Sequence, residues 1–322
     1  MDERALIRRY FSRSAPLAGE RSAIIVGIGD DGAVLRPEPG YDLVVAIDTL
    51  VEGTHFLRDM PSAAVGHRCL AVNLSDVAAM AAEPRWAVLA LAIPEVDEAW
   101  LSGFADGLFA LADRYNVALV GGDTVRGPLA ATVTIHGQAR PGQVVQRRGA
   151  QPGDGVWVTG SPGDAVAGRL LLMDPDKKTG HDELRQELIR RFLFPEPRVL
   201  EGQQLSGLAT AMLDVSDGLH DDLGKLLAAS NVGAEMDIGC LPLSTALQTL
   251  CPRDAIEHAL TGGDDYELCF TVPAAAESSL LKAAESWPVS VTRIGTIIAG
   301  EGARWSLDGR PYRVPDSLWQ HF

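Results

Sequence analysis

The chain alternates between two hydrophobic patterns, one typical of strands and one typical of helices. Short apolar runs bounded by turn residues predict strands in the first half at residues 22–28, 42–47, 86–93, 117–120 and 130–139. Apolar residues at helical spacing predict helices over the first dozen residues, over 63–82 and over 97–115, the last with Asp97 as its N-cap. The first half therefore mixes strands with helices.

The same mixture restarts after residues 140–155, a segment rich in Gly, Pro, Gln and Arg. Strands are predicted at residues 156–159, 210–215, 234–238, 267–272 and 289–298, and helices at 182–194, at 274–285 and directly after GSPGD and SDG. This break predicts two domains, residues 1–140 and 150–322, both of a mixed α/β (α+β) class.

Composition narrows the classes of partner. The 322 residues are enough for two domains, and 46% hydrophobic with 22% charged residues is ordinary for a folded protein. The 28 Lys and Arg residues against 43 Asp and Glu residues give a formal net charge of -15, which disfavours nucleic acid and anionic membranes as partners. An anionic substrate would therefore need metal ions to mediate its binding.

The cysteines and the first residues bear on the compartment. None of the four cysteines forms a C-x-x-C pair, which predicts reduced thiols. The segment MDERALIRRYF carries charges where a secretory signal needs an apolar core, and no apolar run approaches the length of about 18 residues that a membrane helix needs. We expect a cytoplasmic protein.

Aspartates recur at or just after the predicted strands, often beside glycine. They are Asp30, Asp31, Asp48, Asp123, Asp214, Asp217, Asp264 and Asp265, and Asp76 joins them from a helical segment. Any one of them could be a turn residue or a helix N-cap, but the whole set predicts one shared cleft. Like charges about 4 Å apart repel by about 4 kcal/mol at an effective dielectric constant near 20, so such a cleft needs cations. Carboxylates on separate loops, with few histidines, favour Mg²⁺ over zinc or an EF-hand calcium site.

Glycines precede three of these aspartates, as GIG before Asp30 and GG before Asp123 and Asp264, and would let the backbone approach a phosphate. The chain lacks a P-loop, the protein-kinase signatures and a G-x-S-x-G elbow, which favours in-line phosphoryl transfer over covalent catalysis. The roles of two features stay open. Ser161, at the start of a predicted helix, either helps to bind an anion or is a plain N-cap. One of Arg147 and Arg148 binds a phosphate, or both arginines are solvated.

The residue chemistry also leaves two aromatic side chains open. His55 lies in a loop rather than on an apolar helical face, and it is either structural or a ligand contact. Trp319 either anchors the C-terminal tail or stacks on an aromatic ligand.

Seven segments, taken in order, resemble the thiamine-monophosphate kinase family. They are GIGDDGAVL, DTLVEGTHF, VNLSDVAAMAAEP, GGDTVRG, VTGSPGDAVAG, DVSDGLHDDL and TGGDDYELCFTVP, which together span residues 27–270 and more. That family is grouped with aminoimidazole ribonucleotide synthetase, selenophosphate synthetase and a hydrogenase maturation factor. The resemblance implies the two-domain aminoimidazole ribonucleotide synthetase-like fold, with the N-terminal domains of a homodimer pairing into a β-barrel and the active site between the N- and C-terminal halves.

The resemblance also implies a reaction and its residues. ATP would donate its γ-phosphoryl group directly to the phosphate of thiamine monophosphate, giving thiamine diphosphate and ADP without a phosphoenzyme, with several Mg²⁺ ions bridging the substrates. The implied Mg²⁺ ligands are Asp30, Asp31, Asp48, Asp76, Asp123, Asp214 and Asp217. The implied ATP contacts are Gly122, Asp123, Arg147 and Ser216, and the implied thiamine monophosphate contacts are His55, Trp319 and Asp265, with Asp264 as the alternative to Asp265.

One position departs from the family pattern. Family members often have Ser-Thr just before the aspartate that matches Asp48, and this chain has Ala46 and Ile47, so only backbone carbonyls or water could act there. Two other functions compete with the kinase: another ATP-using member of the superfamily, and a non-catalytic module that binds Mg²⁺ and ATP. Selenophosphate synthetase is disfavoured because no cysteine precedes Cys69.

Overall fold

The computed structural model describes residues 3–12, 23–176 and 180–315. Contacts divide the chain into two compact units: unit 1 comprises Met1–Val77 and Ala82–Gly142, and unit 2 comprises Ala78–Ala81 and Gln143–Phe322. Within the described ranges, the helices are all too short or too polar to cross a membrane.

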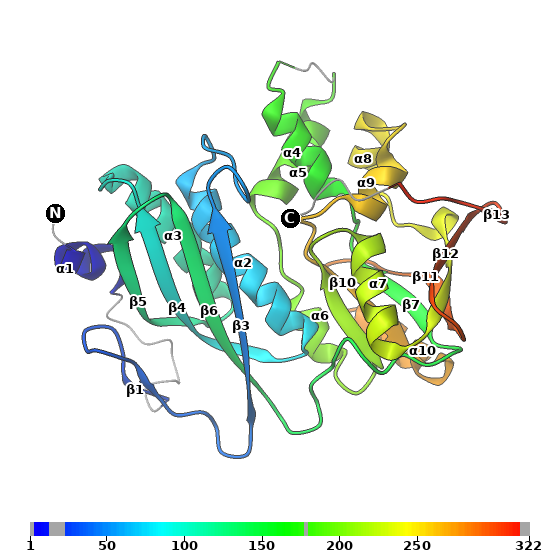
Figure 1. Cartoon of the computed structure of the whole chain (residues 1–322), viewed down its shortest axis with the longest axis horizontal. Helices are drawn as coiled ribbons and strands as arrows, with labels where there is room; N and C mark the ends of the chain where they lie inside the picture. The colour runs from blue at the N-terminus through cyan, green and yellow to red at the C-terminus, as the bar shows by residue number, and fades with distance from the viewer. Residues whose placement is uncertain (1–2, 13–22, 177–179, 316–322) are drawn as a thin grey trace. The chain divides into compact units, whose positions relative to one another are not determined.

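Unit 1 is built on a four-stranded sheet with the order β3-β6-β4-β5 (Figure 1). The four strands are β3 (Asp42–Val51), β4 (Glu83–Ile93), β5 (Ala118–Arg126) and β6 (Ala130–Ala139). Strands β4 and β5 are parallel and are joined through α3 (Glu98–Arg114), whereas the other pairs are antiparallel. Ahead of this sheet come α1 (Glu3–Leu6), the π-helix η1 (Ile7–Phe11) and a small pair of strands, β1 (Ile24–Val26) and β2 (Val34–Leu35).

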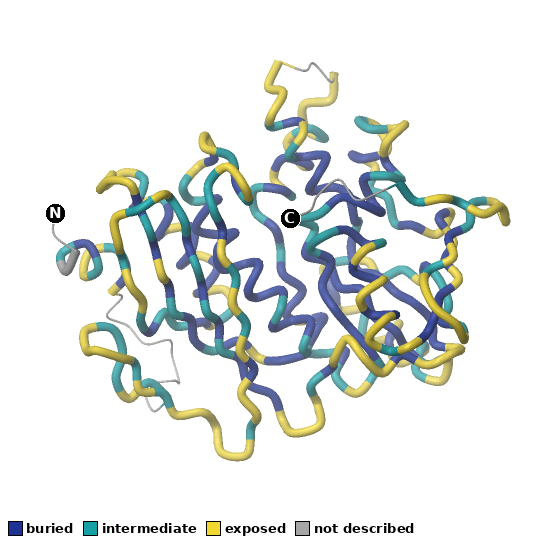
Figure 2. The backbone as a smooth tube through the Cα atoms, viewed as in Figure 1, coloured by how far each residue is buried: buried dark blue, intermediate teal, exposed yellow. Residues whose placement is uncertain are grey.

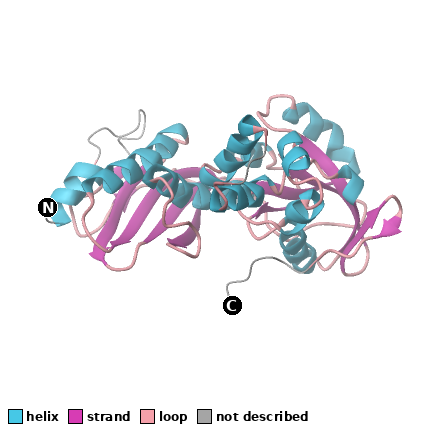
Figure 3. Cartoon of the chain, turned by 90° about the horizontal axis from the view of Figure 1, so that it is seen from above, coloured by secondary structure: helices cyan, strands magenta, loops and turns pink. Residues whose placement is uncertain are grey.

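Two helices cover one face of this sheet. Helix α2 (Ser62–Ala79) and α3 lie along the same side of it (Figure 3). Their backbones approach closely, because a Cβ at Gly66 would overlap the carbonyl of Phe104 and a Cβ at Gly107 would overlap the carbonyl of Ala63. The glycines therefore set the distance between the two helices.

The other face of the sheet is open. Along β3 the exposed residues Leu43, Val45 and Ile47 alternate with the buried Val44 and Leu50 (Figure 2). Because successive side chains of a strand point to opposite faces, this alternation separates a packed face from an exposed apolar one.

Unit 2 contains a seven-stranded sheet with the order β13-β12-β9-β11-β7-β10-β8. The strands are β7 (Gly155–Thr159), β8 (Ala211–Val215), β9 (Gly233–Asp237), β10 (Glu267–Val272), β11 (Val291–Ile298), β12 (Gly302–Leu307) and β13 (Arg310–Pro311). Only the β9–β12 pair is parallel among these described strands. The helices are α4 (Asp164–Met173), α5 (Asp182–Leu193), α6 (Val199–Gln204), α7 (Leu219–Ser230), α8 (Thr245–Leu250), α9 (Ala255–Thr261) and α10 (Glu277–Ala284), with single 3₁₀ turns at η2 (Ile238–Cys240) and η3 (Ala274–Ala276).

The core of unit 2 lies around its central strands. Every residue of β7, β8 and β10 is buried. One cluster of buried residues joins these strands to Leu219, Leu223 and Leu226 of α7 and to Leu260 of α9. Strands buried on both faces read as continuous apolar runs, which is why the sequence pattern located them well.

Most predicted elements are confirmed, and the differences have physical reasons. Asp97 caps α3, as predicted, by accepting hydrogen bonds from the N–H groups of Ala99 and Trp100. Strands β3 and β5 run further than predicted, so Asp48 and Asp123 lie inside strands rather than after them. The short helices α6, α8 and α9 were not predicted, because six or seven residues are too few to show a helical period.

Candidate active site

The Asp48 side chain points to the face of the unit 1 sheet that the helices cover. It is opposite Val133 of β6, and Val133 is opposite Leu89 of β4, which in turn is opposite Gly122 of β5. Directly opposite residues share a face, and both Val133 and Leu89 are buried. The Asp48 charge also raises the pKa of the Cys69 thiol on α2, after the larger effect of burial. Asp48 is thus held against the packed face, partly buried.

The Asp123 side chain points to the other, open face of the same sheet. Its row is the neighbouring one, with Ala90, Thr132 and Thr49 as the opposite residues across the strands. Neighbouring rows face opposite sides of a sheet, and Asp123 is exposed. The sheet of one chain therefore directs Asp48 and Asp123 to different sides.

The remaining predicted ligands of unit 1 come from a loop and a helix. Asp30 and Asp31 are exposed between β1 and β2, where the Asp31 N–H donates to Asp30 Oδ1 at 2.9 Å. Asp76 is partly buried in α2. Among the residues that the structure describes, no three His, Cys, Asp or Glu side chains gather as a group that could hold a metal ion. The prediction of one shared metal cluster stays a prediction.

Two further predicted residues of unit 1 have defined local geometry. The N–H of Val51 donates to His55 Nδ1 at 3.0 Å, which fixes the neutral ring with its proton on Nε2. A Cβ at Gly122 would overlap the carbonyl of Leu89, so only glycine fits there. The glycine thus serves strand packing as well as any approach of a phosphate.

In unit 2, strand β8 carries Asp214 near its end, and the turn between β8 and α7 carries Ser216 and Asp217. Asp214 is 6% exposed on β8. Asp222 Oδ2, from α7, accepts the N–H groups of both Ser216 and Asp217 at 2.9 Å. Lys225 Nζ donates to Asp217 Oδ2 at 2.5 Å and to Asp222 Oδ1 at 2.7 Å. Two residues of α7 thus hold the turn that carries the predicted ligands.

The loop between α9 and β10 packs against this turn. The N–H of Asp264 donates to the carbonyl of Ser216 at 2.9 Å, and a Cβ at Gly263 would come within 2.6 Å of the same oxygen. Asp264 has a left-handed backbone with φ of 71°, and its Oδ1 accepts from the Tyr266 hydroxyl at 3.1 Å. The predicted Asp264 and Ser216 therefore lie together.

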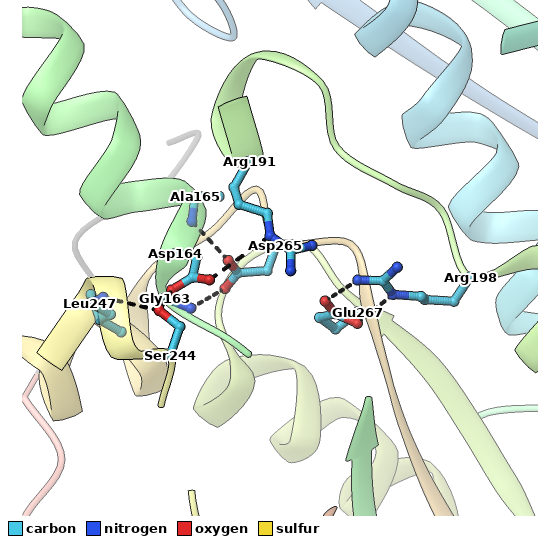
Figure 4. A network of polar contacts seen from close by, with 9 residues as sticks. All are labelled: Gly163, Asp164, Ala165, Arg191, Arg198, Ser244, Leu247, Asp265 and Glu267. Atoms are coloured by element: carbon cyan, nitrogen blue, oxygen red, sulfur yellow. Dashed lines mark hydrogen bonds and ion pairs between the residues drawn. The ribbon is translucent and has the colours of Figure 1, made fainter. Parts of the chain in front are cut away.

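Asp265, its neighbour, turns toward the start of α4 (Figure 4). Its carboxylate accepts the N–H of Gly163 at 2.6 Å and the N–H of Ala165 at 3.1 Å. Burial raises the pKa of Asp265 well above its ordinary value, against the opposite effect of these two bonds. The N-cap of α4 is Gly163, so the alternative that Ser161 is a plain N-cap is wrong. Two of the N–H groups that an anion would need there are already bonded to Asp265.

A second carboxylate beside it is only partly satisfied. Asp164 Oδ1 accepts from the Ser244 hydroxyl at 2.5 Å, whereas Oδ2 lies 3.9 Å from Arg191 Nε and has no hydrogen-bond donor among the described residues (Figure 4). Burial raises the pKa of Asp164 to about 6, against the smaller opposing effects of Ser244 and Arg191. The charge of this carboxylate is therefore poorly compensated.

Glu267, the first residue of β10, is fully paired. Its carboxylate binds the Arg198 guanidinium through two contacts, one of them from Nε at 2.6 Å, and accepts from the Thr159 hydroxyl at 2.6 Å (Figure 4). Burial alone would raise the pKa of Glu267, but the charge and hydrogen bonds of Arg198, the Thr159 hydroxyl and the Arg191 charge together outweigh burial, and the pKa is lowered. This ion pair ties α6 to β7 and β10 in the core.

Family models match both halves of the chain. The AIR synthase related protein, N-terminal domain, matches residues 29–139, and the AIR synthase related protein, C-terminal domain, matches residues 151–307. The thiamine-monophosphate kinase of Escherichia coli K12 is 45% identical over 322 aligned residues, which cover 99% of this chain and 98% of that protein. The chain belongs to the thiamine-monophosphate kinase family.

Solved structures of the family have the same fold. The crystal structure of thiamine-monophosphate kinase from Stenotrophomonas maltophilia K279a matches with a TM-score of 0.85 and 46% identity, over 91% of this chain and 93% of that chain. AaThiL complexed with AMPPCP and TMP matches with a TM-score of 0.77 and 34% identity, over 89% of each chain. The mixed α/β fold with two domains, typical of AIR synthase-related proteins, is thereby confirmed.

The departure from the family pattern before Asp48 also has a structural setting. Ile47 is 62% exposed on the open face of the sheet, and Ala46 lies on the packed face with Asp48. Neither side chain offers an oxygen, so any donor from these two positions is a backbone carbonyl.

Several residues of the site were missed by sequence reasoning. Asp222 and Lys225 support the β8–α7 turn, and Asp164, Arg198 and Glu267 organise the region around Asp265. The segment DVSDGLHDDL did contain Asp222, and its position six residues after Ser216 is the signal that could have identified it as a cap. Of the predicted residues, Arg147 is exposed ahead of β7, and Trp319 lies outside the described residues.

Proposed function

We propose that this chain transfers the γ-phosphoryl group of ATP to the phosphate of thiamine monophosphate, giving thiamine diphosphate and ADP. The observation that carries this is identity of 45% with a thiamine-monophosphate kinase over essentially the whole of both chains. The match to AaThiL complexed with AMPPCP, an analogue of ATP, and TMP supports it, since that match covers 89% of each chain. The transfer is direct and in line, and no side chain forms a covalent intermediate.

The donor set fits Mg²⁺ as the cofactor. The proposed ligands are all carboxylates, the hard oxygen donors that Mg²⁺ prefers, and they are Asp30, Asp31, Asp48, Asp76, Asp123, Asp214 and Asp217. When bound, Mg²⁺ neutralises charge on the transferring phosphoryl group and orients the two anionic substrates. In a chain with a net charge of -15, such neutralisation is needed before two phosphorylated molecules bind side by side.

The proposed ATP contacts are Gly122, Asp123, Arg147 and Ser216. The exposed guanidinium of Arg147 is suited to hold a phosphate through two parallel hydrogen bonds. The backbone N–H of Ser216 donates to Asp222 and its carbonyl accepts from Asp264, and among the described residues its hydroxyl has no partner, so it is available to the nucleotide. These contacts position the donor phosphate for attack.

The proposed thiamine monophosphate contacts are His55, Asp264, Asp265 and Trp319. His55 Nδ1 accepts the Val51 N–H, which orients the imidazole within its loop. Between the two aspartates, the geometry supports Asp264 as the direct contact, because both oxygens of Asp265 already accept N–H groups of α4. Asp265 then holds the loop that presents Asp264.

A homodimer is the proposed assembly, formed by N-terminal domains that pair across strands into a β-barrel. Its support is the open face of the unit 1 sheet, where Leu43, Val45 and Ile47 are 49%, 54% and 62% exposed and Val125 of β5 is 49% exposed. Exposed apolar side chains on both edge strands of an open sheet face are consistent with a protein interface. The domain from residues 1 to 140 would then combine dimerisation with metal and ATP binding, and residues 150–322 would form the second domain.

The cytoplasm is the proposed compartment. The four cysteines are all free thiols, as expected for a reducing environment.

One assay tests the proposed reaction. Purified protein is incubated with ATP, MgCl₂ and thiamine monophosphate, and thiamine diphosphate is separated by chromatography and quantified together with ADP. Equal amounts of the two products are expected. ADP release without thiamine diphosphate would favour another ATP-using member of the superfamily, and tight ATP binding without turnover would favour the non-catalytic module.

A further inference from the structure

A single ammonium group joins two carboxylates at the turn between β8 and α7. Lys225 Nζ lies 2.5 Å from Asp217 Oδ2 and 2.7 Å from Asp222 Oδ1. Asp222 is 2% exposed, whereas the side chains of Asp217 and Lys225 are 42% and 41% exposed. The lysine therefore links a buried carboxylate to one at the surface.

The same buried carboxylate fixes the backbone of the turn. Asp222 Oδ2 accepts the N–H groups of Ser216 and Asp217, both at 2.9 Å. Asp217 is thus held twice, through its backbone by Asp222 and through its side chain by Lys225. Because charge-assisted hydrogen bonds are short and directional, this pair restricts both the position and the rotation of the Asp217 carboxylate.

Helix α7 carries both Asp222 and Lys225 (Figure 1). Asp222 and Lys225 are three residues apart and therefore neighbours on the helix surface. Leu219, Leu223 and Leu226 of the same helix are fully buried in the core of unit 2. The two supporting groups thus rise from a packed helix rather than from a loop.

The support leaves one oxygen of Asp217 available. Asp217 Oδ2 is occupied by Lys225, and Oδ1 accepts no hydrogen bond from the part of the chain that the structure describes. We propose that Lys225 is a positioning residue for metal–nucleotide binding, which together with Asp222 orients the Asp217 carboxylate so that Oδ1 is presented to the cation. This inference rests on the proposed role of Asp217 as a Mg²⁺ ligand.

An opposite role for Lys225 would be competition. An ammonium group repels a divalent cation, so a lysine that merely occupied the cation site would lower metal affinity, and its removal would tighten binding. Solvent and salt screen this repulsion, because the Lys225 side chain is nearly half exposed. Loss of the lysine would also remove the cation from the buried Asp222 and free the Asp217 side chain. Positioning is therefore expected to outweigh repulsion.

Binding of Mn²⁺ in the presence of AMPPCP tests the proposal without turnover. Free Mn²⁺ is measured by electron paramagnetic resonance for the parent and for K225M, K225R, D217N and K282M. Lys282, an exposed residue of α10 in the same unit, is the matched control for removing one lysine charge. We expect K225M to raise the Kd for Mn²⁺ about 10- to 100-fold, the usual cost of losing a partner of a metal ligand, and K225R and K282M to stay within about threefold of the parent.

A kinetic measurement separates positioning from general damage. At saturating MgCl₂, the kcat of K225M is expected to recover to near that of the parent, while the Mg²⁺ concentration for half-maximal rate rises by the same factor as the Kd. Should K225M fail to fold by circular dichroism, K225Q carries the same two measurements. A lowered kcat that no Mg²⁺ concentration restores would overturn the positioning role.

The D217N arm distinguishes this inference from the proposed function. If D217N weakens Mn²⁺ binding and K225M leaves it unchanged or tightens it, the role of Lys225 is refuted and that of Asp217 stands. If D217N itself binds Mn²⁺ like the parent, Asp217 is no ligand, and both the assignment of Asp217 and the inference built on it fail.

Discussion

The two units carry their carboxylates in opposite ways. In unit 1, Asp30, Asp31 and Asp123 are exposed, and Asp48 is partly buried on a strand. In unit 2, the buried Asp164, Asp222 and Glu267 are 2–3% exposed, and each accepts hydrogen bonds. The donors are Ser244 to Asp164, Ser216, Asp217 and Lys225 to Asp222, and Thr159 and Arg198 to Glu267.

This difference shows that acidic segments of similar sequence can have different roles, either exposed to solvent or buried in support of the fold. A carboxylate in water needs no protein partner and is available to a metal ion. A buried carboxylate must be hydrogen-bonded or paired, because an unsatisfied buried group costs about 1–3 kcal/mol and a charged one more. This difference is consistent with the proposal that the exposed carboxylates of unit 1 and the turn residues of unit 2 bind the ligands, while the buried carboxylates support the turn.

The largest expected effect comes from removing the charge of Asp48, a proposed metal ligand of unit 1. Asp48→Asn should lower kcat by about 10³-fold with the stability unchanged, because a metal contact stabilises charge that develops in the transition state. Asp42→Asn, at the exposed start of the same strand, is the control and should keep the parent rate. Rate assays with parallel urea unfolding measure both quantities. An Asp48→Asn enzyme within a few-fold of the parent would remove Asp48 from the metal site.

Removing the partner of a buried carboxylate should lower the free energy of unfolding. Arg198→Met leaves Glu267 as a buried charge without its cation and should cost about 3–5 kcal/mol in the free energy of unfolding. Arg293→Met removes a partly exposed pair with Glu277, in which the arginine and glutamate side chains are 43% and 24% exposed, and should cost about 1 kcal/mol. Urea denaturation compares the two variants, and equal losses would contradict the distinction between buried and exposed carboxylates.

Asp164 should give the stability a pH dependence. Its pKa in the folded protein is about 6, above its ordinary value of 3.8, so the folded state holds the proton more tightly. The resulting stabilisation is fully present below about pH 4 and is lost as the pH rises through about 6, a change of about 3 kcal/mol. Asp164→Asn should remove this component from unfolding curves recorded between about pH 4 and 7. Parallel pH profiles for the two proteins would show that Asp164 is not the responsible group.

The smallest expected effect on the stability of a single chain comes from a substitution on the open face of unit 1. Ile47→Glu should leave the unfolding free energy of a single chain within about 0.5 kcal/mol, because Ile47 is 62% exposed, but should weaken the proposed dimer. Leu170→Glu, at a 47% exposed position of α4, is the control. Light scattering after size exclusion reports the mass of each. A parent that is monomeric, or an Ile47→Glu protein that stays fully dimeric, would exclude this face as the interface.

Sequence reasoning could locate the strands and the acidic segments, because both follow from local residue order. The central strands of unit 2 are continuous apolar runs, and the N-cap Asp97 is followed directly by a periodic helix. The family resemblance depended on the same local segments, and the comparisons confirm it.

The directions of the side chains at the site could not be predicted, because they depend on pairing between strands that are distant in the sequence. That Asp48 and Asp123 leave the sheet on opposite faces follows from the register of β3, β6, β4 and β5, which no single segment encodes. The same holds for the adjacent Asp264 and Asp265. Their different surroundings are set by Ser216 and by the start of α4, about 50 and 100 residues earlier.

The stereochemical course of the transfer tests the central claim most directly. If the aspartates bind metal ions and none becomes phosphorylated, one in-line displacement must invert the configuration at phosphorus. The measurement uses ATP that carries sulfur and ¹⁸O at a γ-phosphorus of known configuration, and determines the configuration of the terminal thiophosphate in the thiamine product. Inversion is predicted. Retention would mean two displacements through a phosphorylated side chain, and would contradict the assignment of these carboxylates to metal binding.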